Sequence, residues 1–122
     1  MPMNDFEKIY NKALEEFENS HFANAMYYFK QSLNDYYDQA MYYMGMMYEL
    51  GLGTKDKQPN HEQAFICYYE AFNSGNEKAA QCFARIYKEF EGKLDYITHK
   101  YPNMDVKQAY LKINNDAPSH QA

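Results

Sequence analysis

The chain has 122 residues, of which 46% are hydrophobic and 24% charged, and its formal net charge is -5. This length predicts one domain with a modest core and excludes a multidomain enzyme. The acidic balance provides no positive field for phosphate backbones or anionic lipids, which argues against nucleic acid and membrane surfaces as partners. No apolar window is long enough to span a membrane, and no secretory signal is visible, so we expect a soluble, cytoplasmic protein.

The residue types favour helices over strands. The β-branched residues are one Val, five Ile and two Thr, whereas the chain contains 14 Tyr, 8 Phe and 8 Met. We therefore expect a helical core built from aromatic side chains and methionine. Two cysteines, Cys67 and Cys82, are too few for a disulfide framework, and we expect them to be free thiols that approach each other without bonding.

Apolar residues recur at steps of three and four through the first predicted helix, from about Asn4 to Asn19. Further helices are predicted over about 22–34, 38–50, 60–74, 76–90 and 105–112, with a short one within 93–103. We expect Asn4 or Asp5, then Asn60 and Asn76, to cap three of these helices, and Gly51 to end the third in the left-handed conformation. Residues 1–114 are predicted to form one helical-repeat domain with units at about 4–36, 38–75 and 76–113, followed by a disordered tail over 115–122.

A repeat is found when the sequence is compared with itself at a shift of 39 residues. Small residues then align with small ones and aromatic residues with bulky ones: Ala25 with Ala64, Ser32 with Ala71, Ala40 with Ala79, Met44 with Phe83, Gly45 with Ala84 and Tyr48 with Tyr87. Periods in this range are typical of stacked helix pairs. We expect Gly45 to pack against Ala64 where two helices cross closely. The predicted fold is all-α, a short α-solenoid of antiparallel helix pairs with about six helices.

The segment from Ala40 to Gly53, followed by Gln63, Ala64 and the positions to Ala79, resembles the Sel-one-like repeat (SLR) family, a relative of the tetratricopeptide repeat (TPR). The family pattern of Ala, Leu-Gly-x-x-Tyr, Gly-x-Gly and a second helix with Ala, Tyr and Ala is nearly filled. The first unit lacks the long loop and is closer to a TPR. The loop before Pro59 is about three residues longer than in the family.

This resemblance implies protein binding through a concave groove lined by the first helix of each pair. The groove positions that it implies step by three and four along one face of each helix. They are Lys8, Asn11, Glu15 and Glu18 in the first unit, Gln39, Tyr42, Met46 and Glu49 in the second, and Lys78, Gln81, Arg85 and Lys88 in the third. The sequence leaves open whether Tyr42 and Met46 line the groove or pack between the repeats.

Catalytic and cofactor chemistry has weak support in the sequence. The Gly51–Asp56 segment lacks the spacing of a phosphate-binding loop and follows a helix. His61, His99 and the two cysteines lack the spacing of a structural zinc site. A cysteine and a histidine could still meet in space as a nucleophile and a base, although buried thiols are more often inert. We expect no enzyme activity, no metal and no cofactor.

Two functions are consistent with these features. The first is a non-catalytic adaptor, scaffold or regulator that holds a protein or peptide in the groove through Tyr42 and Met46 and their charged neighbours. The second is a small acidic inhibitor or immunity protein that neutralises a partner enzyme or toxin. Self-association through the ends of the array is also consistent with three units that lack polar caps.

Overall fold

The computed structural model describes residues 4–90, 93–94 and 96–116, and this part of the chain forms seven α-helices and no strand. The helices are α1 (Asp5–Glu18), α2 (Phe22–Gln31), α3 (Tyr37–Leu50), α4 (His61–Asn73), α5 (Glu77–Glu89), α6 (Tyr96–Lys100) and α7 (Val106–Asp116). The all-α prediction is therefore confirmed. The described helices are six longer ones and the short α6, which lies within 93–103, where a short helix is predicted.

Local side-chain chemistry sets several helix ends. The side-chain oxygens of Asn4, Asn60 and Asn76 accept hydrogen bonds from the backbone N–H three residues ahead, at 2.7, 3.0 and 2.8 Å. These bonds satisfy donors that have no partner within the first turn of a helix. Gly51 ends α3 with φ of 71°, a conformation that glycine adopts without steric cost. The predicted caps are thus confirmed, with Asn4 rather than Asp5 at the first helix.

Two predicted boundaries are wrong. Helix α2 ends at Gln31, not near Asn34, and the hydroxyl of the next residue, Ser32, donates a hydrogen bond to the carbonyl of Phe29 at 2.9 Å. Helix α7 continues to Asp116, although we expected it to end near Lys112, because Ile113 extends its buried face. The remainder of the predicted tail, 117–122, lies outside the described residues.

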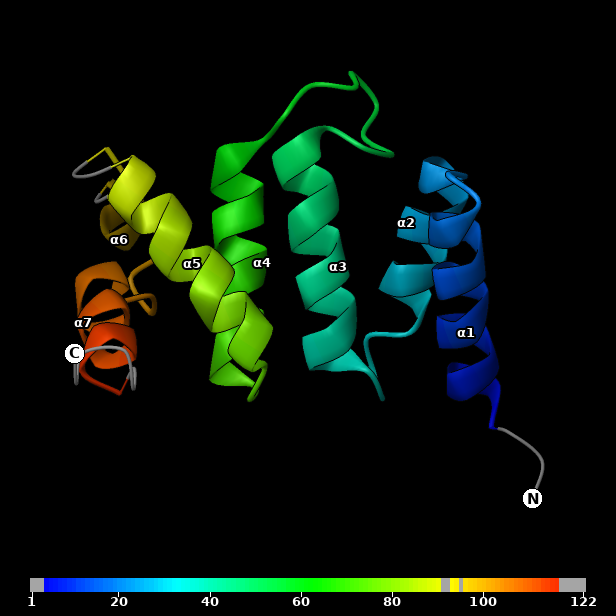
Figure 1. The fold of residues 1–122 in the computed structure, drawn as a ribbon, viewed down its shortest axis with the longest axis horizontal. Helices are drawn as coiled ribbons and strands as arrows, with labels where there is room; N and C mark the ends of the chain where they lie inside the picture. The colour runs from blue at the N-terminus through cyan, green and yellow to red at the C-terminus, as the bar shows by residue number, and fades with distance from the viewer. Residues whose placement is uncertain (1–3, 91–92, 95, 117–122) are drawn as a thin grey trace, which may run out of the picture.

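Consecutive helices from α1 to α5 run in alternating directions, as Figure 1 shows. Helix α1 packs along α2, α3 packs along α4, and α5 packs against α4 and α7. Helices α3 and α5 run in the same direction (Figure 1). A hydrogen bond from Asn76 to Asp38 joins their beginnings, and an ion pair between Arg85 and Glu49 joins their later turns. These two helices therefore present faces to the same side of the molecule.

The buried side chains form two clusters that meet at α3 and α4. One is built mainly from α1, α2 and α3, and the other from α4, α5, α6 and α7. In the two clusters together, the largest fully buried side chains are aromatic rings and a methionine, as the composition predicts. Within the second cluster, Phe65 stacks on Phe83 with ring centroids 4.3 Å apart. The aligned pairs Ala25 and Ala64, Ser32 and Ala71, and Ala40 and Ala79 are all completely buried. The repeat seen in the sequence thus corresponds to equivalent burial.

Close helix contact at Gly45 involves a different neighbour from the one expected. A Cβ atom at this position would lie 2.6 Å from Cε1 of Tyr68, which lies one turn beyond Ala64 on α4. The glycine is therefore required by a completely buried tyrosine ring and not by the approach of an alanine.

Candidate functional site

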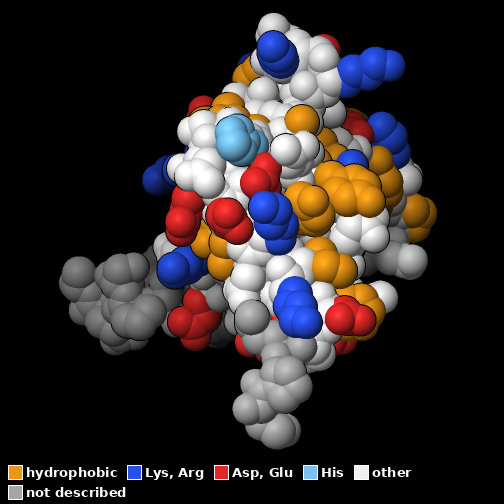
Figure 2. Space-filling model, turned by 90° about the vertical axis from the view of Figure 1, so that its right-hand side faces the viewer, with side chains coloured by type: hydrophobic (Ala, Val, Ile, Leu, Met, Phe, Trp, Pro, Cys, Tyr) orange, Lys and Arg blue, Asp and Glu red, His pale blue; other side chains and the backbone are white. Residues whose placement is uncertain are grey.

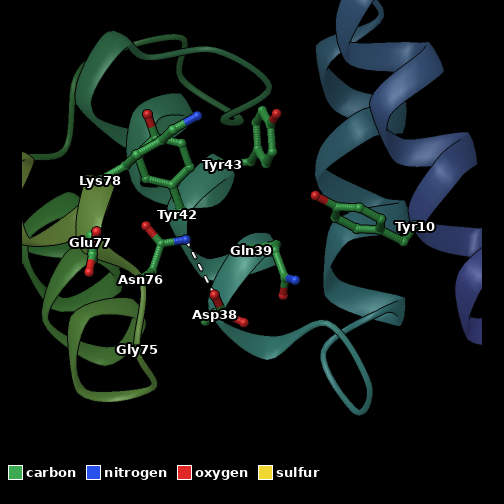
Figure 3. Close-up of a pocket in the computed structure, with 9 residues that line it drawn as sticks. All are labelled: Tyr10, Asp38, Gln39, Tyr42, Tyr43, Gly75, Asn76, Glu77 and Lys78. Atoms are coloured by element: carbon green, nitrogen blue, oxygen red, sulfur yellow. Dashed lines mark hydrogen bonds between the residues drawn. The ribbon is translucent and has the colours of Figure 1, made fainter.

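A pocket of about 440 Å³ opens between the first turns of α3 and α5, with one side closed by α1 (Figure 3). We call it the tyrosine pocket. Its lining consists of three tyrosines and a set of small or polar residues: Tyr10, Asp38, Gln39, Tyr42, Tyr43, Gly75, Asn76, Glu77 and Lys78. Pockets of this size accommodate small ligands or a few side chains of a partner.

Aromatic packing fixes the three tyrosine rings of the tyrosine pocket. Tyr10 stacks on Tyr36 with centroids 4.6 Å apart, and Tyr43 stacks on Phe29 at 5.0 Å. Tyr42 packs edge-on against Tyr43, with centroids 5.6 Å apart. Burial, followed by the proximity of Tyr43 and Asp38, raises the pKa of Tyr10 to about 12, so this phenol stays neutral near pH 7. Rings held in this way lose little side-chain entropy when a partner binds.

The polar groups of the tyrosine pocket are only partly satisfied. Asp38 accepts a long hydrogen bond of 3.4 Å from Nδ2 of Asn76, while the side-chain oxygen of Asn76 caps α5. The Oε1 atom of Gln39 is buried and has no hydrogen-bond partner among the described residues. An unpaired buried acceptor costs free energy that a donor from a ligand would recover. Glu77 and Lys78 are exposed at the rim.

The later turns of α3 and α5 are closed by a polar cluster of Glu49, Tyr68 and Arg85, which we call the Glu49 cluster. The guanidinium of Arg85 binds both carboxylate oxygens of Glu49, each at 2.8 Å, and the hydroxyl of Tyr68 donates to Glu49 at 2.9 Å. Burial favours a raised pKa of Glu49, but together the bonds from Arg85 and Tyr68 outweigh it and hold this pKa below its usual value. Bidentate pairs of this kind are the stronger ion pairs of proteins.

The structure brings some of the predicted groove residues together and leaves others apart. Gln39, Tyr42 and Lys78 line the tyrosine pocket, whereas Glu49 and Arg85 belong to the Glu49 cluster. Met46 is half-buried and packs against the core. The exposed positions that do not line the pocket are Lys8, Asn11, Glu15 and Glu18 on α1 and Gln81 and Lys88 on α5. Tyr42 thus both lines the pocket and packs between helices, so the two alternatives left open by the sequence are combined.

Several residues of the tyrosine pocket are not among the predicted groove positions. Tyr10 is one of the apolar residues that recur through the first predicted helix, and Asn76 is predicted only to cap a helix. Asp38, Tyr43 and Glu77 lie next in sequence to residues that were predicted. The clustering of tyrosines near 36–43 indicates an aromatic site on α3. The relative shift of α1 along α3, which brings Tyr10 to this site, cannot be predicted from helical spacing.

The remaining candidates for chemistry are dispersed in the structure. Cys67 and Cys82 are both free thiols, and burial raises the pKa of Cys67 to about 12, which disfavours its reactive thiolate. Within the described residues, no group of three or more His, Cys, Asp or Glu side chains is placed to hold a metal ion. None of the helices in the described ranges combines the length and apolarity that crossing a membrane requires.

A second surface lies at the α1–α2 end of the molecule. Figure 2 shows exposed hydrophobic side chains there among acidic and basic groups. Tyr27 on α2 is 59% exposed and packs edge-on against Tyr28, with ring centroids 5.2 Å apart.

No protein-family model, curated protein or solved structure matches this chain at a significant level. The resemblance to the SLR family therefore depends on the residues from Ala40 to Ala79 themselves.

Proposed function

We propose that this chain is a non-catalytic interaction module that binds a segment of another protein in the tyrosine pocket. The observation that carries the proposal is the pocket itself, in which three fixed tyrosine rings adjoin Asp38, Gln39 and a charged rim. Tyrosines of this kind supply large contact areas with a polar end, a composition enriched at binding hot spots. The lining includes Gln39, Tyr42 and Lys78, three of the residues that the SLR resemblance implies for partner binding.

We further propose that the helix pairs form a short α-solenoid of the SLR type. Three features support this arrangement: alternating helix directions, preferential packing of α1 with α2 and α3 with α4, and complete burial of three pairs of residues 39 positions apart. Helices α1, α3 and α5 then line the concave side. The tyrosine pocket takes its residues from these three helices and from the turn before α5.

Binding is favoured over catalysis by the residues that line the pocket. Glu77 and Lys78 are exposed at the rim, where their charges can contact a partner. No cysteine, histidine or serine is present among the residues that line the pocket. The chain thus offers a surface for contact and orientation.

The proposal is tested by affinity capture from native lysate with wild-type protein, Lys78→Glu and Lys107→Glu as baits, read by quantitative mass spectrometry. Lys78 and Lys107 are both exposed and both occupy the second position of a helix, so the two variants change charge in matched local settings. We expect a partner that Lys107→Glu retains and Lys78→Glu loses, because the exposed Lys78 ammonium at the rim would contact an acceptor group of that partner, and a carboxylate there would repel it.

Retention of every partner by Lys78→Glu would contradict the proposal. If the captured partner is an enzyme whose activity the chain blocks, the chain is an inhibitor. If the chain captures only itself, the α1–α2 end becomes the better candidate surface.

A further inference from the structure

The tyrosine pocket has a polarity that favours one kind of side chain. At the first turn of α3, Asp38 and Gln39 supply neighbouring acceptor groups to the pocket wall. Among the described residues, Asp38 receives one hydrogen bond, a long one from Asn76, and Oε1 of Gln39 receives none. The α3 wall of the pocket therefore presents a carboxylate with one long hydrogen bond and, within the described part of the chain, an amide oxygen with none.

The basic group of the pocket lies apart from this wall. Figure 3 shows the Lys78 side chain extending past the ring of Tyr42, away from Asp38. Glu77 adds a second carboxylate at the rim, so the charged residues of the lining are two acids and one base. The local field beside Asp38 is therefore negative and attracts a cation.

The aromatic rings complete a site for a cation. Tyr10 and Tyr43 each have one face covered by stacking, on Tyr36 and Phe29, and both line the pocket beside Gln39. A cation placed against a tyrosine ring is attracted by its negative face, and the attraction grows when water is excluded. Three rings and a carboxylate around one pocket thus combine two independent sources of cation affinity.

We propose that the tyrosine pocket receives an arginine side chain of the partner, an inference that rests on the proposed function. Guanidinium is planar and carries five N–H donors, so it can stack on a tyrosine ring while donating to Asp38 and to Gln39. The terminal amide torsion of glutamine is broad, so a small rotation turns Oε1 toward the ligand. The pocket volume of about 440 Å³ exceeds that of one guanidinium and leaves room for the adjoining residues of a peptide.

The test uses two acetylated and amidated tripeptides, Ala-Arg-Ala and Ala-citrulline-Ala, which differ by the charge of a near-isosteric group. Each is titrated into the full chain labelled at tyrosine rings, and the affinity is read by NMR from the resonances of Tyr10, Tyr42 and Tyr43. We expect saturable shifts with the arginine peptide and about fivefold weaker binding of the citrulline peptide. Equal affinities, or no saturable shift at these rings, would overturn the proposal.

Variants make the test specific. Asp38→Asn is expected to remove most of the preference for arginine over citrulline, and Gln39→Glu to increase that preference. Asp5→Asn makes the same change at an exposed residue of α1 outside the pocket and is expected to leave the preference unchanged. A preference that survives in Asp38→Asn, or is lost equally in Asp5→Asn, would contradict the assignment.

The tripeptide result and the lysate capture are independent. A partner that depends on Lys78, combined with no arginine preference, would overturn this inference and leave the proposed function standing. Arginine preference in the pocket without any partner that depends on Lys78 would support the pocket chemistry and contradict the proposed function.

Discussion

The two ends of the contact between α3 and α5 differ in how their polar groups are satisfied. At the later turns, Arg85 binds both oxygens of Glu49 and Tyr68 adds a third hydrogen bond, so the Glu49 cluster is closed. At the first turns, one bond of 3.4 Å joins Asn76 to Asp38, and Gln39 has an unpaired acceptor. The Glu49 cluster thus joins the two helices, whereas the tyrosine pocket between their first turns holds polar groups that are only partly satisfied among the described residues.

The largest loss of stability is expected from a larger side chain at Gly45, which packs against Tyr68 of the Glu49 cluster. Gly45→Leu places a side chain where Tyr68 already lies, and we expect it to destabilise the fold by about 3 kcal/mol through overpacking. Chemical denaturation followed by circular dichroism measures this loss. As a control, Gly45→Ala in a Tyr68→Ala background should stabilise the chain by about 1 kcal/mol, because alanine favours a helix once the clash is gone. Unchanged stability of Gly45→Leu would contradict this packing.

A smaller loss is expected when the Glu49 cluster loses its cation. Arg85→Met leaves the mostly buried Glu49, whose side chain is 17% exposed, with Tyr68 as its remaining donor in the cluster. We expect a destabilisation of about 1 kcal/mol, limited because the Arg85 side chain is itself 49% exposed. Lys88→Met, at an exposed position on the same helix, should change stability by less than about 0.5 kcal/mol. If Arg85→Met and Lys88→Met changed the free energy of unfolding equally, the ion pair between Arg85 and Glu49 would have no structural role.

The pH dependence of stability should report the same cluster. The pKa of Glu49 is lower in the folded state than its ordinary value of 4.5, so the folded protein binds this proton more weakly than the unfolded chain does. The stabilisation is present above about pH 4.5 and is lost as the pH falls through the folded pKa. Urea unfolding between pH 3 and 7 should therefore show a shallower acid-side loss in Glu49→Gln than in wild type. An unchanged slope would show that the carboxylate is not held as described.

The smallest effect on stability is expected from a substitution at the rim of the tyrosine pocket. Lys78 is exposed, lines the tyrosine pocket and lies in the first turn of α5, where a negative charge is compatible with the helix dipole. We expect Lys78→Glu to change the free energy of unfolding by less than about 0.5 kcal/mol, as surface substitutions usually do. Thermal and urea unfolding measure this change. A large loss of stability would mean that the pocket rim is structural.

Much of the fold could be predicted from local signals. The three asparagine caps and the left-handed Gly51 mark helix ends, which depend on short-range chemistry. The shift of 39 residues reflects the burial of equivalent positions in successive helix pairs. Helix ends without such a signal were predicted less well, as at Ser32, whose buried hydroxyl bonds back to Phe29, and at Ile113, which extends α7.

The site was predicted less completely than the fold. Helical spacing indicates which face of each helix is apolar, and it places Gln39, Tyr42 and Lys78, which line the tyrosine pocket, among the predicted groove positions. It does not give the stagger between helices, so it could not show that Tyr10 joins this group. Nor could it show that Glu49 and Arg85, both predicted groove positions, form an ion pair with each other.

The central claim, that a partner binds in the tyrosine pocket, is tested most directly by photo-crosslinking. A photoreactive amino acid is placed at position 77, on the pocket rim, or at position 107, on the exposed first turn of α7, and each protein is irradiated in native lysate. We predict a covalent adduct with a distinct protein from position 77 and none from position 107. An adduct from position 107 alone would contradict the account and place the partner at α7.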